Sequence, residues 1–131
     1  MIDDIIKFYQ SFDEYKQASP QLLHYHLESS ISLNQYKIFG DGEITGFINW
    51  AYLNDVMKMK VMHHGIIDYG NWKCGTNLVF GDLLCRKNLR DMIKWAKKYF
   101  GSELGYDKEV IWIKTFKNNR IVRVNKNVKY S

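Results

Sequence analysis

The chain has 131 residues, of which 46% are hydrophobic and 25% charged, which is typical of a single folded domain and argues against disorder. The formal net charge of +5 favours an acidic partner, such as nucleic acid, an anionic cofactor or an acidic carrier protein. No apolar run approaches the roughly 20 residues that cross a bilayer, and acidic residues follow Met1 where a signal peptide would be basic, so we expect a cytoplasmic protein.

Hydrophobic periodicity predicts two helices and then two strands in the first third of the chain. Ser19-Pro20 marks the second helix start, because serine caps helices and proline suits the first helical position. Asp41-Gly42 tolerates the positive φ of a tight turn and predicts a hairpin. These elements are expected at residues 2–17, 20–33, 36–40 and 43–53.

The remainder of the chain alternates between helical and strand patterns. Asn118-Asn119 predicts the turn between the last two strands. We expect a short helix at 54–64, a loop at 65–75, a strand at 78–84, a helix at 88–100 and strands at 109–116 and 120–124. This order predicts one α/β (α+β) domain over residues 1–131, with a mixed, mostly antiparallel sheet flanked by helices, as in N-acetyltransferases.

One acidic residue, Asp82, interrupts the apolar strand that follows the turn at Gly75. A carboxylate inside such a strand is costly unless it is paired, hydrogen-bonded or used. Asp82 is therefore predicted either to cap the next helix or to be a functional carboxylate at the end of a central strand, where open α/β sheets bind ligands.

Several short motifs resemble the RTX-toxin-activating lysine acyltransferases over about residues 8–100. The chain reads asparagine-glutamine-tyrosine at Asn34, tryptophan-alanine at Trp50, and Trp72-Lys73-Cys74-Gly75 before a strand that contains Asp82. The tryptophan–glycine–aspartate block is the most specific part. The short chain and basic C-terminal hairpin are similar to small, often phage-encoded, relatives.

The resemblance implies a fold like the N-acetyltransferases and transfer of a fatty acyl group from acyl-carrier protein to lysine amines of a partner protein. It also implies a working pair of Asp82 with a histidine near the N-terminus. Anchoring on Ser19-Pro20 favours His24 over His26, whereas a gapless alignment places Tyr15 at this position. The pair is chemically sensible, because a histidine takes the proton that a lysine must lose before it attacks a thioester.

An acyl-carrier protein as donor would require a groove for the acyl chain and a surface that binds the carrier. An apolar groove is predicted from four aromatic residues, Phe47, Trp50, Trp72 and Phe80. No glycine-rich loop for a pyrophosphate follows Asp82, which favours a carrier protein over acetyl-CoA. Basic residues would dock the acidic carrier: Arg86, Lys87 and Arg90.

Two other functions stay open at this point: a catalytically inactive binding module on the same fold, such as a phage protein that engages a host factor, and an N-acetyltransferase-like enzyme that modifies nucleic acid. The spacing of the four histidines with Cys74 and Cys85 matches no standard zinc pattern, so we expect no metal site. No permanently bound cofactor is expected.

Overall fold

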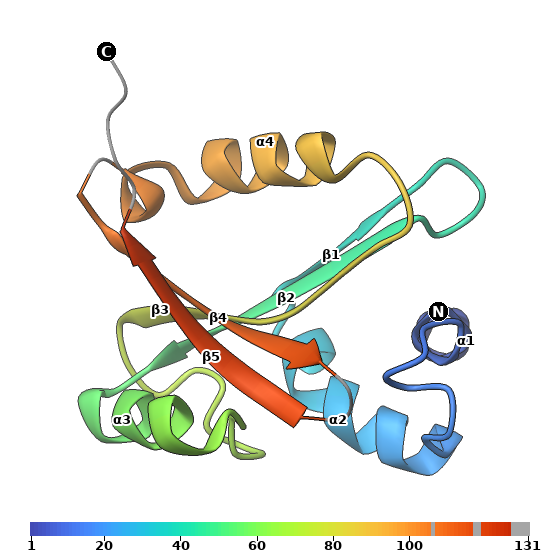
Figure 1. Ribbon diagram of the computed structural model, residues 1–131, viewed down its shortest axis with the longest axis horizontal. Helices are drawn as coiled ribbons and strands as arrows, with labels where there is room; N and C mark the ends of the chain where they lie inside the picture. Colours follow the sequence, from blue (N-terminus) through green and yellow to red (C-terminus); the bar gives the residue numbers. More distant parts are fainter. Residues whose placement is uncertain (106, 117–118, 127–131) are drawn as a thin grey trace.

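The computed structural model describes residues 1–105, 107–116 and 119–126. Four α-helices and a five-stranded sheet follow the predicted order (Figure 1). Their bounds are α1 (Ile2–Gln10), α2 (Pro20–Ser32), β1 (Tyr36–Phe39), β2 (Gly46–Leu53), α3 (Asp55–His64), β3 (Asn77–Cys85), α4 (Leu89–Phe100), β4 (Glu109–Phe116) and β5 (Asn119–Lys126), with a 3-10 turn at Gly101–Leu104.

The sheet has the order β1-β2-β3-β4-β5 and is mixed, as predicted. Its neighbouring strands are antiparallel except β3 and β4, which are parallel. These two strands pair only at Val79–Ile111 and Phe80–Trp112. Beyond that point β3 continues along β2 and β4 along β5, so the sheet opens between β3 and β4. The predicted likeness to N-acetyltransferases in particular stays a prediction.

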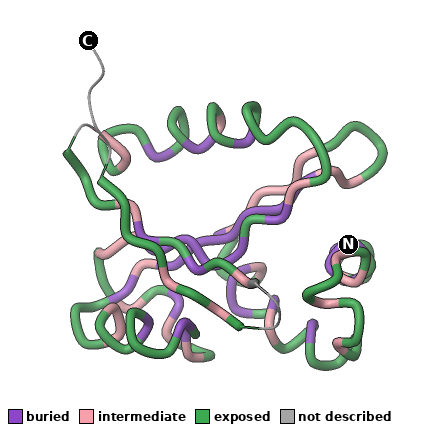
Figure 2. The backbone as a smooth tube through the Cα atoms, in the orientation of Figure 1, coloured by how far each residue is buried: buried purple, intermediate pink, exposed green. Residues whose placement is uncertain are grey.

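Helices cover both faces of the sheet (Figure 1). On one face α4 packs over Ile48, Trp50 and Phe80. On the other face α1 and α2 pack over Phe47 and Leu84, and α3 covers the neighbouring part of the same face. Figure 2 shows the buried residues concentrated in the strands and on the helix sides that face them, as expected from burial of apolar surface.

The first helix is shorter than predicted, because it ends at Gln10 and turns follow it. The Ser11 hydroxyl donates to the carbonyl of Phe8, and the Gln10 side chain donates to the carbonyl of Ala18. These side-chain bonds compete with helical ones and close a loop. The loop turns Tyr15 back toward the sheet, which a helix continued to residue 17 would not do.

Other differences are small. The β1–β2 loop contains Asp41-Gly42, but it is longer than a two-residue turn, so β2 begins at Gly46. Gly40 and Gly42 both have positive φ there. Of the predicted turn at Asn118-Asn119, Asn118 lies outside the described residues and β5 begins at Asn119.

A β-bulge interrupts the pairing of β2 with β3. Ile48 pairs with Leu83 and Trp50 with Phe80, so Gly81 and Asp82 together lie opposite one residue of β2. A bulge shifts the alternation of side chains by one residue. It therefore turns Asp82 toward the face covered by α1 and α2, the same face as Leu84.

Candidate active site

Asp82 lies at the centre of the site and is only 4% exposed. The residue does not cap α4, whose N-cap is Asn88 and makes no side-chain cap bond. The side-chain oxygen of Asn49 on β2 accepts a hydrogen bond from the backbone N–H of Asp82 at 2.7 Å. Asn49 in turn donates to the hydroxyl of Ser30 on α2, so the bulge is linked to the helix that covers it.

The carboxylate of Asp82 contacts four donors from separate parts of the chain. Oδ2 lies 2.7 Å from the Tyr9 hydroxyl and 2.6 Å from Nε2 of His26. Oδ1 lies 3.2 Å from the Tyr15 hydroxyl and 3.4 Å from Nη1 of Arg120. The charge is therefore buried but well hydrogen-bonded, which is the condition under which proteins tolerate a buried carboxylate.

These neighbours decide the ionisation of Asp82. Burial by itself would raise the pKa of this carboxyl, but the charge and hydrogen bond of His26 outweigh that effect. The charge of Arg120 and the hydrogen bond from Tyr9 act in the same direction, so the pKa of Asp82 lies well below its ordinary value. Asp82 is thus an anion at neutral pH.

The structure brings His26, and not His24, to Asp82. His24 is exposed, whereas the side chain of His26 is 26% exposed and directed at the carboxylate. The expectation that His24 would face Asp82 was therefore wrong, because it rested on the distance from Ser19-Pro20 and not on which side of α2 is buried. On α2 the buried residues are Leu23, Leu27, Ser29 and Ser30. His26 follows Leu23 by three positions and precedes Ser30 by four, which places it on the buried side.

Tyr15, the residue placed at the histidine position by gapless alignment, also reaches Asp82. Its hydroxyl lies 3.3 Å from Oγ1 of Thr115 and 3.4 Å from Nη1 of Arg120. Its ring lies beside the imidazole of His26, with centroids 6.2 Å apart. His26 and Tyr15 therefore lie side by side, and each contacts a different oxygen of Asp82.

Arg120 is held in place from the far side of the site. Its Nε donates to the carbonyl of Gly65, the residue that ends α3 with a positive φ. Its Nη1 then faces Asp82, Tyr15 and Thr115, which is its partner across the β4–β5 pair. Arg120 therefore connects the end of α3, the loop after α1 and strand β4 to the carboxylate of Asp82.

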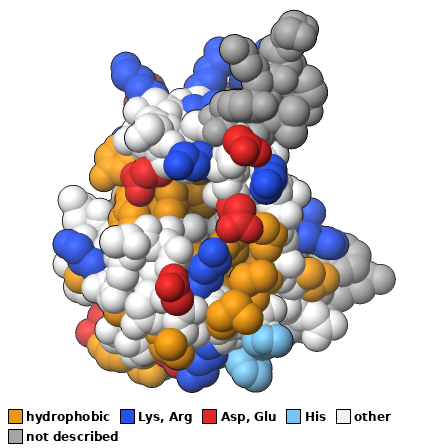
Figure 3. Space-filling model, turned by 90° about the vertical axis from the view of Figure 1, so that its left-hand side faces the viewer, with side chains coloured by type: hydrophobic (Ala, Val, Ile, Leu, Met, Phe, Trp, Pro, Cys, Tyr) orange, Lys and Arg blue, Asp and Glu red, His pale blue; other side chains and the backbone are white. Residues whose placement is uncertain are grey.

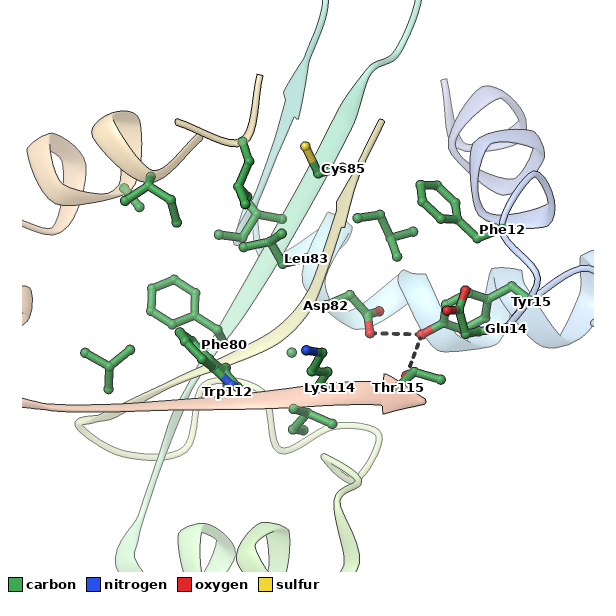
Figure 4. A pocket seen from close by; sticks show the side chains of 18 of the residues that line it. Phe12, Glu14, Tyr15, Phe80, Asp82, Leu83, Cys85, Trp112, Lys114 and Thr115 are labelled. Carbon is green, nitrogen blue, oxygen red and sulfur yellow. Dashed lines mark hydrogen bonds between the residues drawn. The ribbon is translucent and has the colours of Figure 1, made fainter. Parts of the chain in front are cut away.

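An apolar cavity of about 550 Å³ adjoins Asp82, where β3 and β4 diverge (Figure 4). Its polar end, as the close-up shows, is formed by Tyr15, Asp82 and Thr115 together with Glu14 and Lys114. The rest of its wall is mainly apolar and includes Phe80, Leu83, Ile93, Ala96 and Trp112. A cavity of this volume with a few polar groups at one end is typical of a site for a small molecule or a cofactor arm.

The predicted groove residues separate in the structure. Phe80 lines the cavity, but Phe47, Trp50 and Trp72 are not among its lining residues. They belong to three different packed clusters, and each is at most 5% exposed. Phe47 and Trp50 point to opposite faces of β2, and Trp72 lies in the loop before β3, so each ring packs in the core beneath the helices.

The three residues predicted to dock the carrier are all exposed, but they differ in their contacts with the rest of the protein. Lys87 and Arg90 are exposed. Arg86 is exposed too, but its guanidinium donates to the backbone and hydroxyl of Ser11 and lies 4.0 Å from the centre of the Phe12 ring. Arg86 therefore has a structural role in holding the loop that carries Tyr15.

Sequence reasoning did not find Tyr9, Arg120, Asn49 and Thr115 as site residues. Asn49 offered a signal, because it is a polar residue inside the apolar strand sequence FINWAY. Tyr9 and Arg120 offered none, since a tyrosine in an apolar stripe and an arginine in a basic hairpin are ordinary.

Cys74 and Cys85 are free thiols. Within the described residues no three His, Cys, Asp or Glu side chains gather so as to hold a metal ion. The helices in that part of the chain are too short or too polar to cross a membrane.

The fold and site define an α+β protein with a hydrogen-bonded histidine–aspartate pair beside an apolar cavity, an arrangement suited to moving protons next to an apolar ligand. The model of the RTX toxin acyltransferase family matches residues 1–125. The chain therefore belongs to this acyltransferase family, which confirms the resemblance drawn from the motifs. A search among curated proteins gave no match.

Proposed function

We propose that this protein is a protein lysine acyltransferase, which moves an acyl group from acyl-carrier protein to an amine on a partner protein. The observation that carries the proposal is the 2.6 Å contact of His26 with Asp82 beside the apolar cavity. Family membership supports the acyltransferase class.

His26 is the general base in this proposal, and Asp82 orients it. Since Nε2 faces the carboxylate, the other ring nitrogen, Nδ1, is the one that accepts the proton of the acceptor amine. The ionised Asp82 stabilises the imidazolium that forms. About a quarter of the His26 side chain is exposed, so a lysine of a partner protein can reach it from solvent.

The proposed reaction is a nucleophilic substitution at the thioester carbonyl. A lysine ammonium loses one proton to His26, which passes it to solvent. The amine nitrogen attacks the thioester carbonyl carbon, a C–N bond forms, and the carbonyl π pair moves to oxygen. On collapse this pair returns, the C–S bond breaks, and the leaving sulfur takes the second proton lost by nitrogen. The products are an amide and the free thiol of the carrier.

The acyl chain and the carrier occupy different parts of the surface. The chain lies in the cavity between β3 and β4, next to the α4 residues Leu89, Ile93 and Ala96. Lys87 and Arg90 flank Leu89 in the sequence and are exposed, so an acidic carrier bound there stands next to the cavity wall.

The charge distribution gives less support to the alternative function, an enzyme that modifies nucleic acid, than to a protein acyltransferase. On the face in Figure 3 acidic and basic side chains are interspersed with hydrophobic ones, without a continuous basic surface. Lys58, Lys60 and Lys126 each form an ion pair with a carboxylate. Nucleic acid is normally bound by clustered, unpaired basic residues.

The test is intact-mass analysis of candidate acceptor proteins after incubation with this protein and a carrier charged with medium- or long-chain acyl groups. A mass increase of one acyl group on an acceptor lysine, lost in Asp82→Asn, supports the proposal. Absence of acyl transfer together with stable acceptor binding would favour the inactive binding module. Acylation from acetyl-CoA but not from the carrier would overturn the donor.

A further inference from the structure

We propose that the Tyr15 hydroxyl is the group that donates a hydrogen bond to the thioester carbonyl oxygen as negative charge develops on it. This makes Tyr15 a catalytic residue in addition to the His26–Asp82 pair, and it rests on the acyl transfer proposed above.

The cavity wall gives the first reason. Asp82, Tyr15 and Thr115 line the cavity, whereas His26 and Tyr9 do not. A thioester whose acyl chain fills the cavity therefore meets Tyr15 at the polar end (Figure 4). His26 lies beside the Tyr15 ring but contacts the other oxygen of Asp82, toward the exposed side. The two residues are placed to act on different atoms, the carbonyl oxygen and the amine nitrogen.

The hydrogen-bond lengths give the second reason. Tyr9 contacts Asp82 at 2.7 Å, an ordinary length for a hydroxyl donor to a carboxylate. The Tyr15 contacts with Asp82 and Thr115 are 3.2 and 3.3 Å, beyond the usual range of such bonds. The Tyr15 proton is therefore loosely held and can turn to a substrate, while Asp82 keeps its short bonds to Tyr9 and His26.

The ionisation of Tyr15 suits a donor and not a base. Burial, and then the charge of Asp82, raise the pKa of this phenol well above its ordinary value of 10. Tyr15 therefore keeps its proton throughout the neutral range. Nη1 of Arg120, 3.4 Å from the hydroxyl oxygen, adds positive charge behind the donor. A neutral phenol supported in this way stabilises an oxyanion without becoming ionised itself.

Tyr9 provides a matched control. Both tyrosines donate to Asp82, but Tyr9 is fully buried and does not line the cavity. If Tyr15 served only to hold Asp82, its loss would cost no more than the loss of Tyr9, whose bond is shorter. A direct role at the carbonyl predicts the opposite order.

The experiment compares Tyr15→Phe with Tyr9→Phe by following thiol release from dodecanoyl-carrier protein with saturating acceptor amine. We expect kcat to fall about 10²- to 10³-fold in Tyr15→Phe, with KM for the acyl carrier nearly unchanged. Tyr9→Phe should lose less than about tenfold, since Asp82 retains three other donors. Thermal melting checks that Tyr15→Phe is no less stable than Tyr9→Phe.

Equal losses in the two variants, or a larger loss in Tyr9→Phe, would show that Tyr15 acts only through Asp82 and would overturn the inference. A rise in KM at constant kcat would also overturn it, because it would indicate ground-state binding alone. If wild-type protein released no more thiol than Asp82→Asn, the proposed transfer itself would fail, and the role of Tyr15 with it.

Discussion

The side-chain oxygen of Asn49 lies 2.7 Å from the backbone nitrogen of Asp82 and accepts its hydrogen bond. A strand without a bulge would use this N–H in the ladder and would continue the strict alternation of side chains. Asn49 replaces the lost ladder bond, so the bulge is stable and Asp82 is held toward α1 and α2. A polar residue in β2 thus determines which helices Asp82 contacts.

The bulge also requires Gly81. A Cβ there would lie 2.6 Å from Oδ1 of Asn49 and 3.0 Å from Cη2 of Trp72. We expect Gly81→Ala to destabilise the fold by about 1–3 kcal/mol and to lower activity more than stability alone explains, because Asp82 would be displaced. Asn49→Leu should cost a similar amount by leaving the Asp82 N–H unpaired. Urea unfolding and turnover measure both, and a fully active, stable Gly81→Ala variant would contradict this view of the bulge.

The two histidines of α2 give a direct test of the base. His26→Gln should reduce acyl transfer by about 10²- to 10⁴-fold, since proton removal from the amine loses its base. His24→Gln is the control, because His24 is exposed on the same helix. Steady-state rates at neutral pH compare them, and a large loss in His24→Gln with little loss in His26→Gln would reverse the assignment.

Asp82→Asn is nearly isosteric and removes the charge. We expect the variant to keep its far-ultraviolet circular dichroism and to lose acyl transfer, because the amide no longer stabilises an imidazolium. The measurement is turnover beside the spectrum. Unchanged turnover would exclude Asp82 from the reaction, and loss of the fold without loss of specific activity would make its role structural.

The same variant reports how stability depends on pH. The folded-state pKa of Asp82 lies below the unfolded value of about 3.9, because the charge and hydrogen bond of His26, and then Arg120, outweigh the effect of burial. The stabilisation is therefore complete above the unfolded pKa and is lost as pH falls toward the folded one. The difference in unfolding free energy between wild type and Asp82→Asn should shrink as pH is lowered from about 5 to 3. A difference that grew on acidification would contradict the sign.

The residue Ala96 should influence the acyl chain that the cavity accepts. It lines the cavity from α4 and is 5% exposed, so Ala96→Leu adds volume where the chain lies. We expect kcat/KM to shift toward shorter acyl groups by about tenfold or more, as a few methylenes in an apolar pocket would give. Ile93→Ala enlarges the same wall and should shift the preference the other way. Parallel changes for all chain lengths would show that the chain lies elsewhere.

Much of the fold is determined locally by the sequence. The element order, the helix start at Ser19-Pro20 and the mixed sheet follow from periodicity and capping, which depend on neighbours a few residues apart. Asp82 was identified because one charge in an apolar strand is unfavourable without partners.

The partners of Asp82 were decided only by tertiary structure. They come from α1, α2, the loop after α1 and β5, which lie 38 to 73 positions away along the chain. The bulge at Gly81 shifts the alternation of side chains along β3 by one residue, and the pattern of apolar residues in the sequence does not predict this shift. Because Leu23 and Ser30 are buried, α2 turns His26 and not His24 toward Asp82. The cavity lies where β3 and β4 stop pairing. Each of these depends on contacts between distant segments, so local patterns could not determine them.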